Sequence, residues 1–408
     1  MGLGNRTRKK GFYLANPFFA YAFVWLTTLW LTSLQLTDFL NTLNAKTITL
    51  VFSNIASFGF VFVLLSHRSK KKRPPIRRII HIGDIEVLNN FILKLVLIWI
   101  SGTIFEILIS GGVPLLWLLA ANRARDYRHF GIPVFHGMMN ALHLLSLVGT
   151  FLVYNIKREK KTLVLFIGLL GWTILVFSRG LLFLSLLEIL GIYLLIEKMS
   201  LSKILKVVAL FLLVLIIFGV MGDFRVGVDK PLDKTVFIHI KKDAYEVFNR
   251  LPRGIYWAYL YTTIGINNVN AVVENLQPTY AFSQSIAQLV PSVLREQFVR
   301  SEGYALPLVV KGFTASTYYA GFLADFGMIG SIMIVIILQF IIVLFYKLAI
   351  RGNVWAMLAY AALFQSLVLS VFWDTFTSLP IVAQIFFALY LKRISRLHRK
   401  NAFAAKSS

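Results

Sequence analysis

The sequence contains no cysteine, and only 15% of its 408 residues are charged. Without thiols the chain can form neither a disulfide nor a thiolate metal site. Its seven histidines are scattered without metal-ligand spacing, and we find neither a phosphate-binding Walker loop nor a dinucleotide glycine fingerprint. We therefore expect no metal and no cofactor, and the sequence argues against a nucleotide-driven pump.

Apolar residues dominate instead, at 58% of the chain with a mean hydropathy of +0.73. Soluble domains are about half apolar and about a quarter charged. Apolar stretches of roughly 20 residues, long enough to cross a bilayer, recur along the whole chain. We predict an all-α, polytopic integral membrane protein, one membrane domain over residues 1–408. Its roughly ten transmembrane helices are predicted at about 17–36, 47–66, 91–110, 134–155, 162–178, 180–196, 204–221, 327–346, 354–373 and 376–392.

The net charge of +24 would suit nucleic-acid binding, but its distribution argues for a topological signal instead. Most lysines and arginines fall in short segments on one side of the predicted membrane, of which Arg68–Arg78 is the strongest. Such an excess of basic residues marks cytoplasmic loops. We expect a multi-pass protein of a bacterial inner membrane with both termini in the cytoplasm and no nucleic-acid partner. The first apolar stretch, Pro17–Leu36, lacks a small-residue cleavage site and is expected to be retained. Residues His81–Asn90 are expected to lie along the inner surface.

Residues 222–326, between the seventh and eighth predicted helices, are expected to form a large periplasmic loop. It contains ten basic and nine acidic residues, so it is nearly neutral, and Trp257–Tyr261 and Ala281–Leu289 are predicted to be short amphipathic helices. Its arginines are mixed with carboxylates and aromatics, which suits a ligand made of saccharide and phosphate. An ordinary solvated loop with ion pairs is the alternative. The candidate binding residues of this loop are Arg250, Arg253, Arg295 and Tyr318.

Isolated arginines at the outer ends of helices are further candidates. Arg179 lies at the tip of a helical hairpin without an adjacent acid, and Arg225 follows the exit of the seventh helix. A cation there tends to face a cavity, and snorkelling to headgroups is the alternative. Two guanidiniums at one membrane level would neutralise a lipid diphosphate. In the outer segment 111–133, Arg125 and Arg128 oppose the usual charge preference of a translocated segment, which suggests a binding role or headgroup contact.

Three groups are candidates for proton transfer. Glu106 is a carboxylate inside the third predicted helix, which marks it as functional by default, although it would also suit a structural pair with an arginine such as Arg179. His136 begins the fourth helix and is either a proton acceptor or a hydrogen-bonded packing residue. Asp325 precedes the eighth helix, where capping that helix is the structural alternative.

Several short segments carry a resemblance through their order along the chain. Glu106 is followed by Gly111–Leu115, by Tyr127–Pro133 with His136-Gly137, by Ser178-Arg179-Gly180, by Gly222-Asp223-Phe224-Arg225, and by Thr317 leading to Asp325-Phe326-Gly327 with Gly330. Together they resemble the oligosaccharide repeat unit polymerase family, the O-antigen polymerases known as Wzy. The resemblance covers residues 91–346 approximately.

The resemblance implies a GT-C-like membrane glycosyltransferase of lipopolysaccharide or polysaccharide biosynthesis, with the large loop capping an outer-leaflet cavity. Such an enzyme moves a growing chain from undecaprenyl diphosphate onto a new lipid-linked repeat unit, without metal or nucleotide. Arg179 and Arg225 would then stabilise the diphosphate leaving group, followed by Arg128 and Arg253. The base for the acceptor hydroxyl is left open among Asp325, His136 and Glu106. The bilayer and the lipid-linked oligosaccharide are implied partners, and a chain-length-determining co-polymerase is left open.

Three other functions are compatible with this architecture. An O-antigen ligase would use a similar donor but transfer the chain to the lipid A core. A flippase or exporter of lipid-linked oligosaccharide would make no bond, but the sequence shows no inverted repeat of the kind found in secondary transporters. A non-catalytic scaffold of envelope assembly is the third. The Gly111–Pro114 and Phe130–Pro133 segments favour the polymerase.

Overall fold

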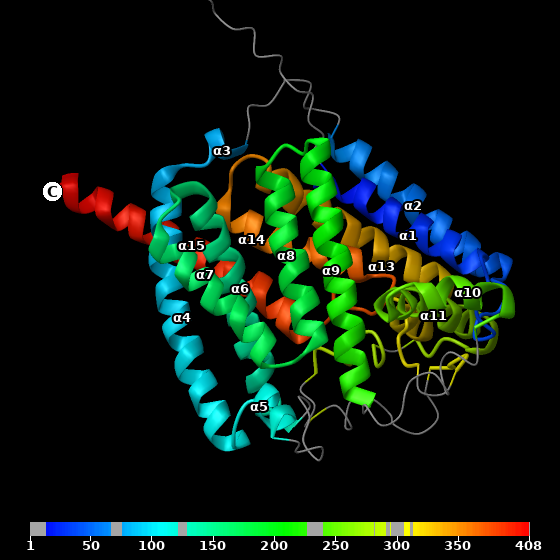
Figure 1. Ribbon diagram of the computed structural model, residues 1–408. Helices are drawn as coiled ribbons and strands as arrows, with labels where there is room; N and C mark the ends of the chain where they lie inside the picture. Colours follow the sequence, from blue (N-terminus) through cyan, green and yellow to red (C-terminus); the bar gives the residue numbers. More distant parts are fainter. Residues whose placement is uncertain are drawn as a thin grey trace, which may run out of the picture.

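The computed structural model describes residues 14–66, 76–120, 129–226, 240–280, 282–290, 294, 306–310 and 313–407. Every regular element in these ranges is a helix (Figure 1). The helices are α1 (Pro17–Ser33), α2 (Ala45–Ser66), α3 (Ile76–Ile79), α4 (Ile82–Ser110), α5 (Pro114–Leu119), α6 (Phe135–Lys157), α7 (Lys160–Leu175), α8 (Arg179–Ile196), α9 (Leu201–Val226), α10 (Lys242–Arg250), α11 (Arg253–Asn275), α13 (Tyr319–Ala349), α14 (Val354–Leu369) and α15 (Leu379–Ser407). The predicted all-α class is confirmed.

Five segments are long and apolar enough to cross a membrane, and they lie in α2, α4 with α5, α6, α8 and α13. Large apolar side chains also cover the outside of the bundle, where Phe23 and Leu108 on different helices are among the most exposed. A water-facing surface would not carry such a belt, whereas a lipid-facing one requires it. The predicted membrane character is therefore confirmed. Each of the ten predicted ranges overlaps a helix, but a count of ten spans stays a prediction.

The centre of the bundle is α14, which packs against α8, α13 and α15. Almost every residue of this helix is buried, as expected of a helix that is apolar all round. Small residues such as Ala356 and Ala361 allow its neighbours to approach closely. Figure 1 shows α14 behind α6, α8 and α9, with α1 and α2 to one side of the bundle and α4 on the other.

Three predictions of local structure were wrong. Residues 82–90 are part of the continuous helix α4 rather than a segment along the inner surface, because Ile85, Leu88 and Ile92 continue one buried stripe into the span. Trp257–Tyr261 belongs to α11, whose 23 residues far exceed the short helix expected. Residues 282–290 form successive turns instead of a regular helix.

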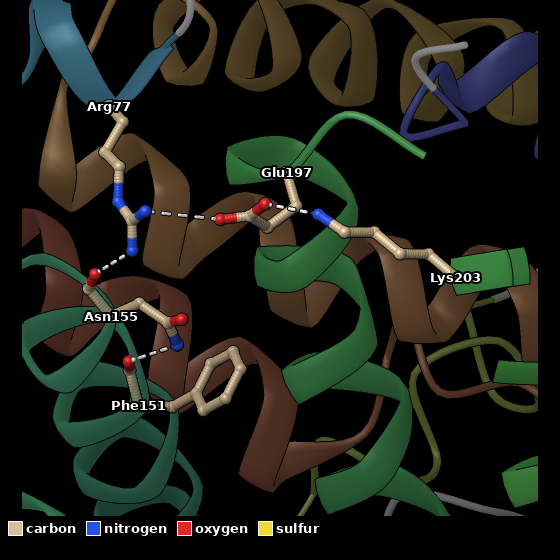
Figure 2. Close-up of polar contacts among 5 residues, drawn as sticks. All are labelled: Arg77, Phe151, Asn155, Glu197 and Lys203. Atoms are coloured by element: carbon tan, nitrogen blue, oxygen red, sulfur yellow. Dashed lines mark hydrogen bonds and ion pairs between the residues drawn. The ribbon is translucent and has the colours of Figure 1, made fainter. Parts of the chain in front are cut away.

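A set of polar contacts joins α3, α6, α8 and α9 at the end that the basic residues predict to be cytoplasmic. The Glu197 carboxylate lies 2.6 Å from Lys203 Nζ and 3.5 Å from Arg77 Nη1, and Arg77 also donates to the backbone carbonyl of Asn155 near the end of α6 (Figure 2). The hydrogen bond from Lys203 is the main reason that the pKa of Glu197 lies below its ordinary value. Since cations are favoured at helix C-termini, Arg77 suits this position at the end of α6.

Candidate functional site

Two of the proton-transfer candidates meet at the end of the bundle opposite α3. Glu106, near the C-terminal end of α4, is 1% exposed. The Nδ1 atom of His136, the second residue of α6, lies 3.2 Å from each of its carboxylate oxygens. The backbone N–H of Ile132 donates to the same carboxylate at 3.3 Å. Because 26% of the histidine side chain is exposed, the pair has a buried carboxyl group on one side and an accessible imidazole on the other.

The chain reaches this geometry through glycines in the left-handed region. Gly111 ends α4 with φ of 70°, and Gly131 brings the returning chain back to the helix end with φ of 87°. The Gly131 N–H donates to Ser110 Oγ at 2.9 Å. A Cβ atom added at Gly131 would lie only 2.7 Å from Glu106 Oε1 and from His136 Cγ. Only glycine fits both the conformation and the space.

An aromatic cluster packs against the imidazole through Phe130. The ring of Phe130 meets the imidazole of His136 edge-on, with centroids 5.4 Å apart. Phe130 also contacts Trp117 of α5 and Trp172 of α7, at centroid distances of 6.3 Å and 6.0 Å. Phe130 therefore packs against the imidazole, and the two tryptophans hold Phe130 in place.

This arrangement is suited to proton transfer. An Nδ1–H that donates to an ionised carboxylate leaves Nε2 as the atom with the lone pair. The carboxylate then holds the tautomer in place and stabilises the imidazolium after a proton is taken up. In this geometry the buried Glu106 is positioned to orient the imidazole, and Nε2 of His136 is the atom that could accept a proton.

Gly131→Ala tests whether the pair depends on this close approach. We expect the unfolding temperature to fall by several degrees, since a residue with φ > 0 and a clash at 2.7 Å costs on the order of 1–3 kcal/mol. The reactivity of His136 toward diethyl pyrocarbonate should rise as the imidazole leaves the carboxylate. Gly168→Ala is the matched control, because no atom lies within 4 Å of the added Cβ and alanine favours the helix. Equal unfolding temperatures for both variants would contradict the close packing.

Arg179 is the first residue of α8 and is partly buried. The helix starts there because Ser178 Oγ accepts the N–H of Leu181 at 3.4 Å, an ordinary N-cap contact. A Cβ added at the next residue, Gly180, would lie 3.4 Å from the Trp373 ring. The tip of the α7–α8 hairpin therefore lies beside the segment 370–378.

That segment contains Asp374, which the sequence analysis did not select. Its carboxylate accepts hydrogen bonds from the backbone N–H groups of Phe376 at 2.9 Å and Thr377 at 3.4 Å. Burial raises the pKa of Asp374 to about 6. A carboxyl group that titrates near neutrality at this end of the bundle is a second candidate for handling protons.

Asp325 has a different kind of environment. It lies inside α13, next to the break in the helix at Gly327 where φ is 64°, and it is 0% exposed. Its carboxylate accepts hydrogen bonds from the backbone N–H groups of Gln284 and Ser285, at 3.0 Å and 2.7 Å, and from Ser285 Oγ at 2.6 Å. The expected cap of the eighth helix is therefore wrong, because α13 begins six residues earlier at Tyr319. Asp325 instead anchors residues 283–285.

The remaining predicted residues are spread along the outer segments. Tyr318 is buried and its hydroxyl lies 2.7 Å from that of Tyr21. Arg250 is the last residue of α10, while Arg225 lies in the last turn of α9 and Arg253 begins α11. The other three predicted positions lie outside the described residues: Arg125, Arg128 and Arg295.

An asparagine cluster on α11 escaped the sequence analysis. Asn268 donates to the carbonyls of Phe313 and Ala315, at 2.9 Å and 2.7 Å. Asn267 and Asn270 accept backbone N–H groups of the loop between α1 and α2, both at 2.8 Å. The sequence feature that could have revealed this cluster is the occurrence of three asparagines within four positions of an otherwise apolar stretch. Through them α11 holds two outer segments in place.

Glu188 is a second carboxylate within a candidate span that the sequence analysis missed. It lies on α8, is fully buried, and accepts a hydrogen bond from Gln384 of α15 at 2.5 Å. A buried polar pair of this kind joins two helices in the absence of water.

Within the part of the chain that the structure describes, no three His, Cys, Asp or Glu side chains gather closely enough to hold a metal ion. Comparison of the chain with protein-family models, with curated proteins and with solved structures gives no match.

Proposed function

We propose that this chain is a polymerase of lipid-linked oligosaccharide repeat units, acting at the outer face of a bacterial inner membrane. In this proposal ten helices cross the membrane, both termini are cytoplasmic, and residues 222–326 cover a cavity open to the outer leaflet. The growing chain moves from undecaprenyl diphosphate onto a new lipid-linked repeat unit.

One observation supports the proposal most directly, namely the pairing of Glu106 with His136. Two of the segments that carry the family resemblance, Gly111–Leu115 and Tyr127–Pro133, lie in the chain that joins these two residues. The structure brings the ends of this stretch together around a carboxylate and an imidazole. Glycosyl transfer needs such a base to deprotonate the acceptor hydroxyl.

The reaction proceeds by attack of the acceptor oxygen on the anomeric carbon of the donor sugar. His136 Nε2 takes the hydroxyl proton as the new carbon–oxygen bond forms, and Glu106 stabilises the resulting imidazolium. The bond from the anomeric carbon to the diphosphate oxygen breaks, and its electron pair leaves with the lipid diphosphate. Arg179 and Arg225 stabilise that charge with their guanidinium groups.

Arg179→Ala tests the leaving-group role. With lipid-diphosphate-linked repeat units as substrate, wild-type protein should form a ladder of products on a gel, and the variant should form it roughly a hundredfold more slowly. Lys161→Ala is the matched control, because this exposed cation lies at the opposite end of the bundle. Transfer to the lipid A core in place of a ladder would identify a ligase, and transport without bond formation would identify a flippase. Either result would refute the proposed polymerase function.

A further inference from the structure

A cavity of about 400 Å³ lies at the end of the bundle that is predicted to be cytoplasmic. Its walls come from α3, the start of α4, the turn between α13 and α14, and α15. The reaction proposed above takes place at the other end of the molecule. This cavity therefore has a separate role.

The polar lining of the cavity favours an anion. Arg351 and Lys392 are two permanent cations, and His81 adds a third basic side chain, against the single carboxylate of Asp84. Ser395 is 3% exposed and lines the same space, and a serine hydroxyl can donate a hydrogen bond to an anion.

Two helices also begin at this cavity. His81 precedes the first residue of the 29-residue helix α4 and makes no capping hydrogen bond with its side chain. Asn353 precedes α14, where its side chain accepts only the N–H of Ala356, at 3.1 Å. Helix N-termini carry partial positive charge and unpaired N–H groups, so both add to the attraction for an anion.

The remaining lining is apolar and includes Leu348 and Trp355. Beside the cavity, Ile82 is 68% exposed, and beyond the exposed polar residues Glu86 and Asn90 the outer face of α4 is mainly apolar from Leu93 onward. A ligand with both a phosphate and hydrocarbon chains would match a cationic cavity that is partly apolar and lies near a lipid-facing helix. Cationic pockets between helices on the cytoplasmic side are suited to anionic headgroups.

We propose that this cavity binds a phosphate group, supplied by the headgroup of an anionic phospholipid in the cytoplasmic leaflet. Arg351 and Lys392 pair with the phosphate, Ser395 donates a hydrogen bond to it, and Trp355 lies against the glycerol region. The bound lipid would then link α4, α13 and α15 at their cytoplasmic ends.

Native mass spectrometry of the full-length protein in a neutral detergent tests this site. The probes are phosphatidylglycerol, phosphatidylcholine and inorganic phosphate. We expect wild-type protein to retain phosphatidylglycerol in preference to phosphatidylcholine. The double variant Arg351→Ala/Lys392→Ala should bind phosphatidylglycerol roughly 30-fold more weakly, since each cation near a membrane surface contributes about a factor of five. Ser395→Leu, which fills the cavity without a change in charge, should also lose the lipid.

The matched control is Lys160→Ala/Lys161→Ala, which removes two exposed cations from the same end of the molecule. Retention of lipid by this control, with loss in the two cavity variants, supports the site. If the control loses phosphatidylglycerol to the same extent, the proposed site is wrong, and general electrostatic attraction explains the binding. If the protein binds inorganic phosphate through Arg351 but does not bind phosphatidylglycerol, the phosphate does not come from a lipid, and the lipid proposal is wrong. Unfolding temperatures without lipid should match the wild type, which separates lost binding from misfolding.

Discussion

His136→Ala is expected to slow repeat-unit polymerisation by roughly two to four orders of magnitude, the usual contribution of a positioned general base. The variant retains the buried Glu106 carboxylate but removes the imidazole that lies 3.2 Å from it. The acceptor hydroxyl would then have to lose its proton to water. The measurement is the initial rate of ladder formation from purified protein with lipid-diphosphate-linked repeat units.

Glu106→Gln separates the base from the group that orients it. A glutamine amide can donate to Nδ1, which moves the imidazole proton to Nε2 and leaves no lone pair for the acceptor. The rate should therefore fall strongly although the side chain keeps its size, and part of it should return at higher pH, where an acceptor hydroxyl loses its proton more readily. A merely structural pair would show no such pH dependence.

Lys161→Ala is the control for both variants, because this exposed residue lies at the opposite end of the bundle. It should polymerise at the wild-type rate. A normal ladder from well-folded His136→Ala would refute the catalytic role and reduce the pair to a packing contact between α4 and α6.

The helices were the predictable part of this protein. Apolar runs of about 20 residues and the basic segments between them located most of the long helices, because a span is marked by its own composition. The ends were less accurate, since α13 begins at Tyr319 and α15 continues to Ser407. The exceptions were elements whose ends depend on partners. Helix α4 extends back to Ile82 and α11 continues to Asn275, because packing in the folded protein overrides local polarity.

The site was less predictable because it is formed by contacts distant in sequence. Glu106 and His136 were both candidates, yet their pairing across 30 residues depends on the left-handed backbone at Gly111 and Gly131. No spacing rule relates such positions. The anchoring role of Asp325 likewise depends on Gln284 and Ser285, about 40 positions away.

The second large effect is expected for Asp325, and on stability. Asp325→Ala would leave the backbone N–H groups of Gln284 and Ser285 and the hydroxyl of Ser285 without their shared acceptor. Each buried donor left unsatisfied costs about 1–3 kcal/mol, and hydrogen bonds to a charged group are at the strong end. We expect a total loss of roughly 3–5 kcal/mol, measured as a lower unfolding temperature, together with faster proteolysis within residues 282–290.

Asp325→Asn and Asp243→Ala complete this test. Asparagine keeps one acceptor oxygen but directs an NH₂ group at donors, so its loss of stability should lie between wild type and alanine. Asp243 is an exposed carboxylate in the first turn of α10, and its removal should change stability by less than about 0.5 kcal/mol. If Asp325→Ala unfolds and is cleaved like the wild type but makes no ladder, the anchoring role is wrong. Asp325 would then replace His136 as the leading candidate for the base, because loss of activity without loss of stability requires a chemical role.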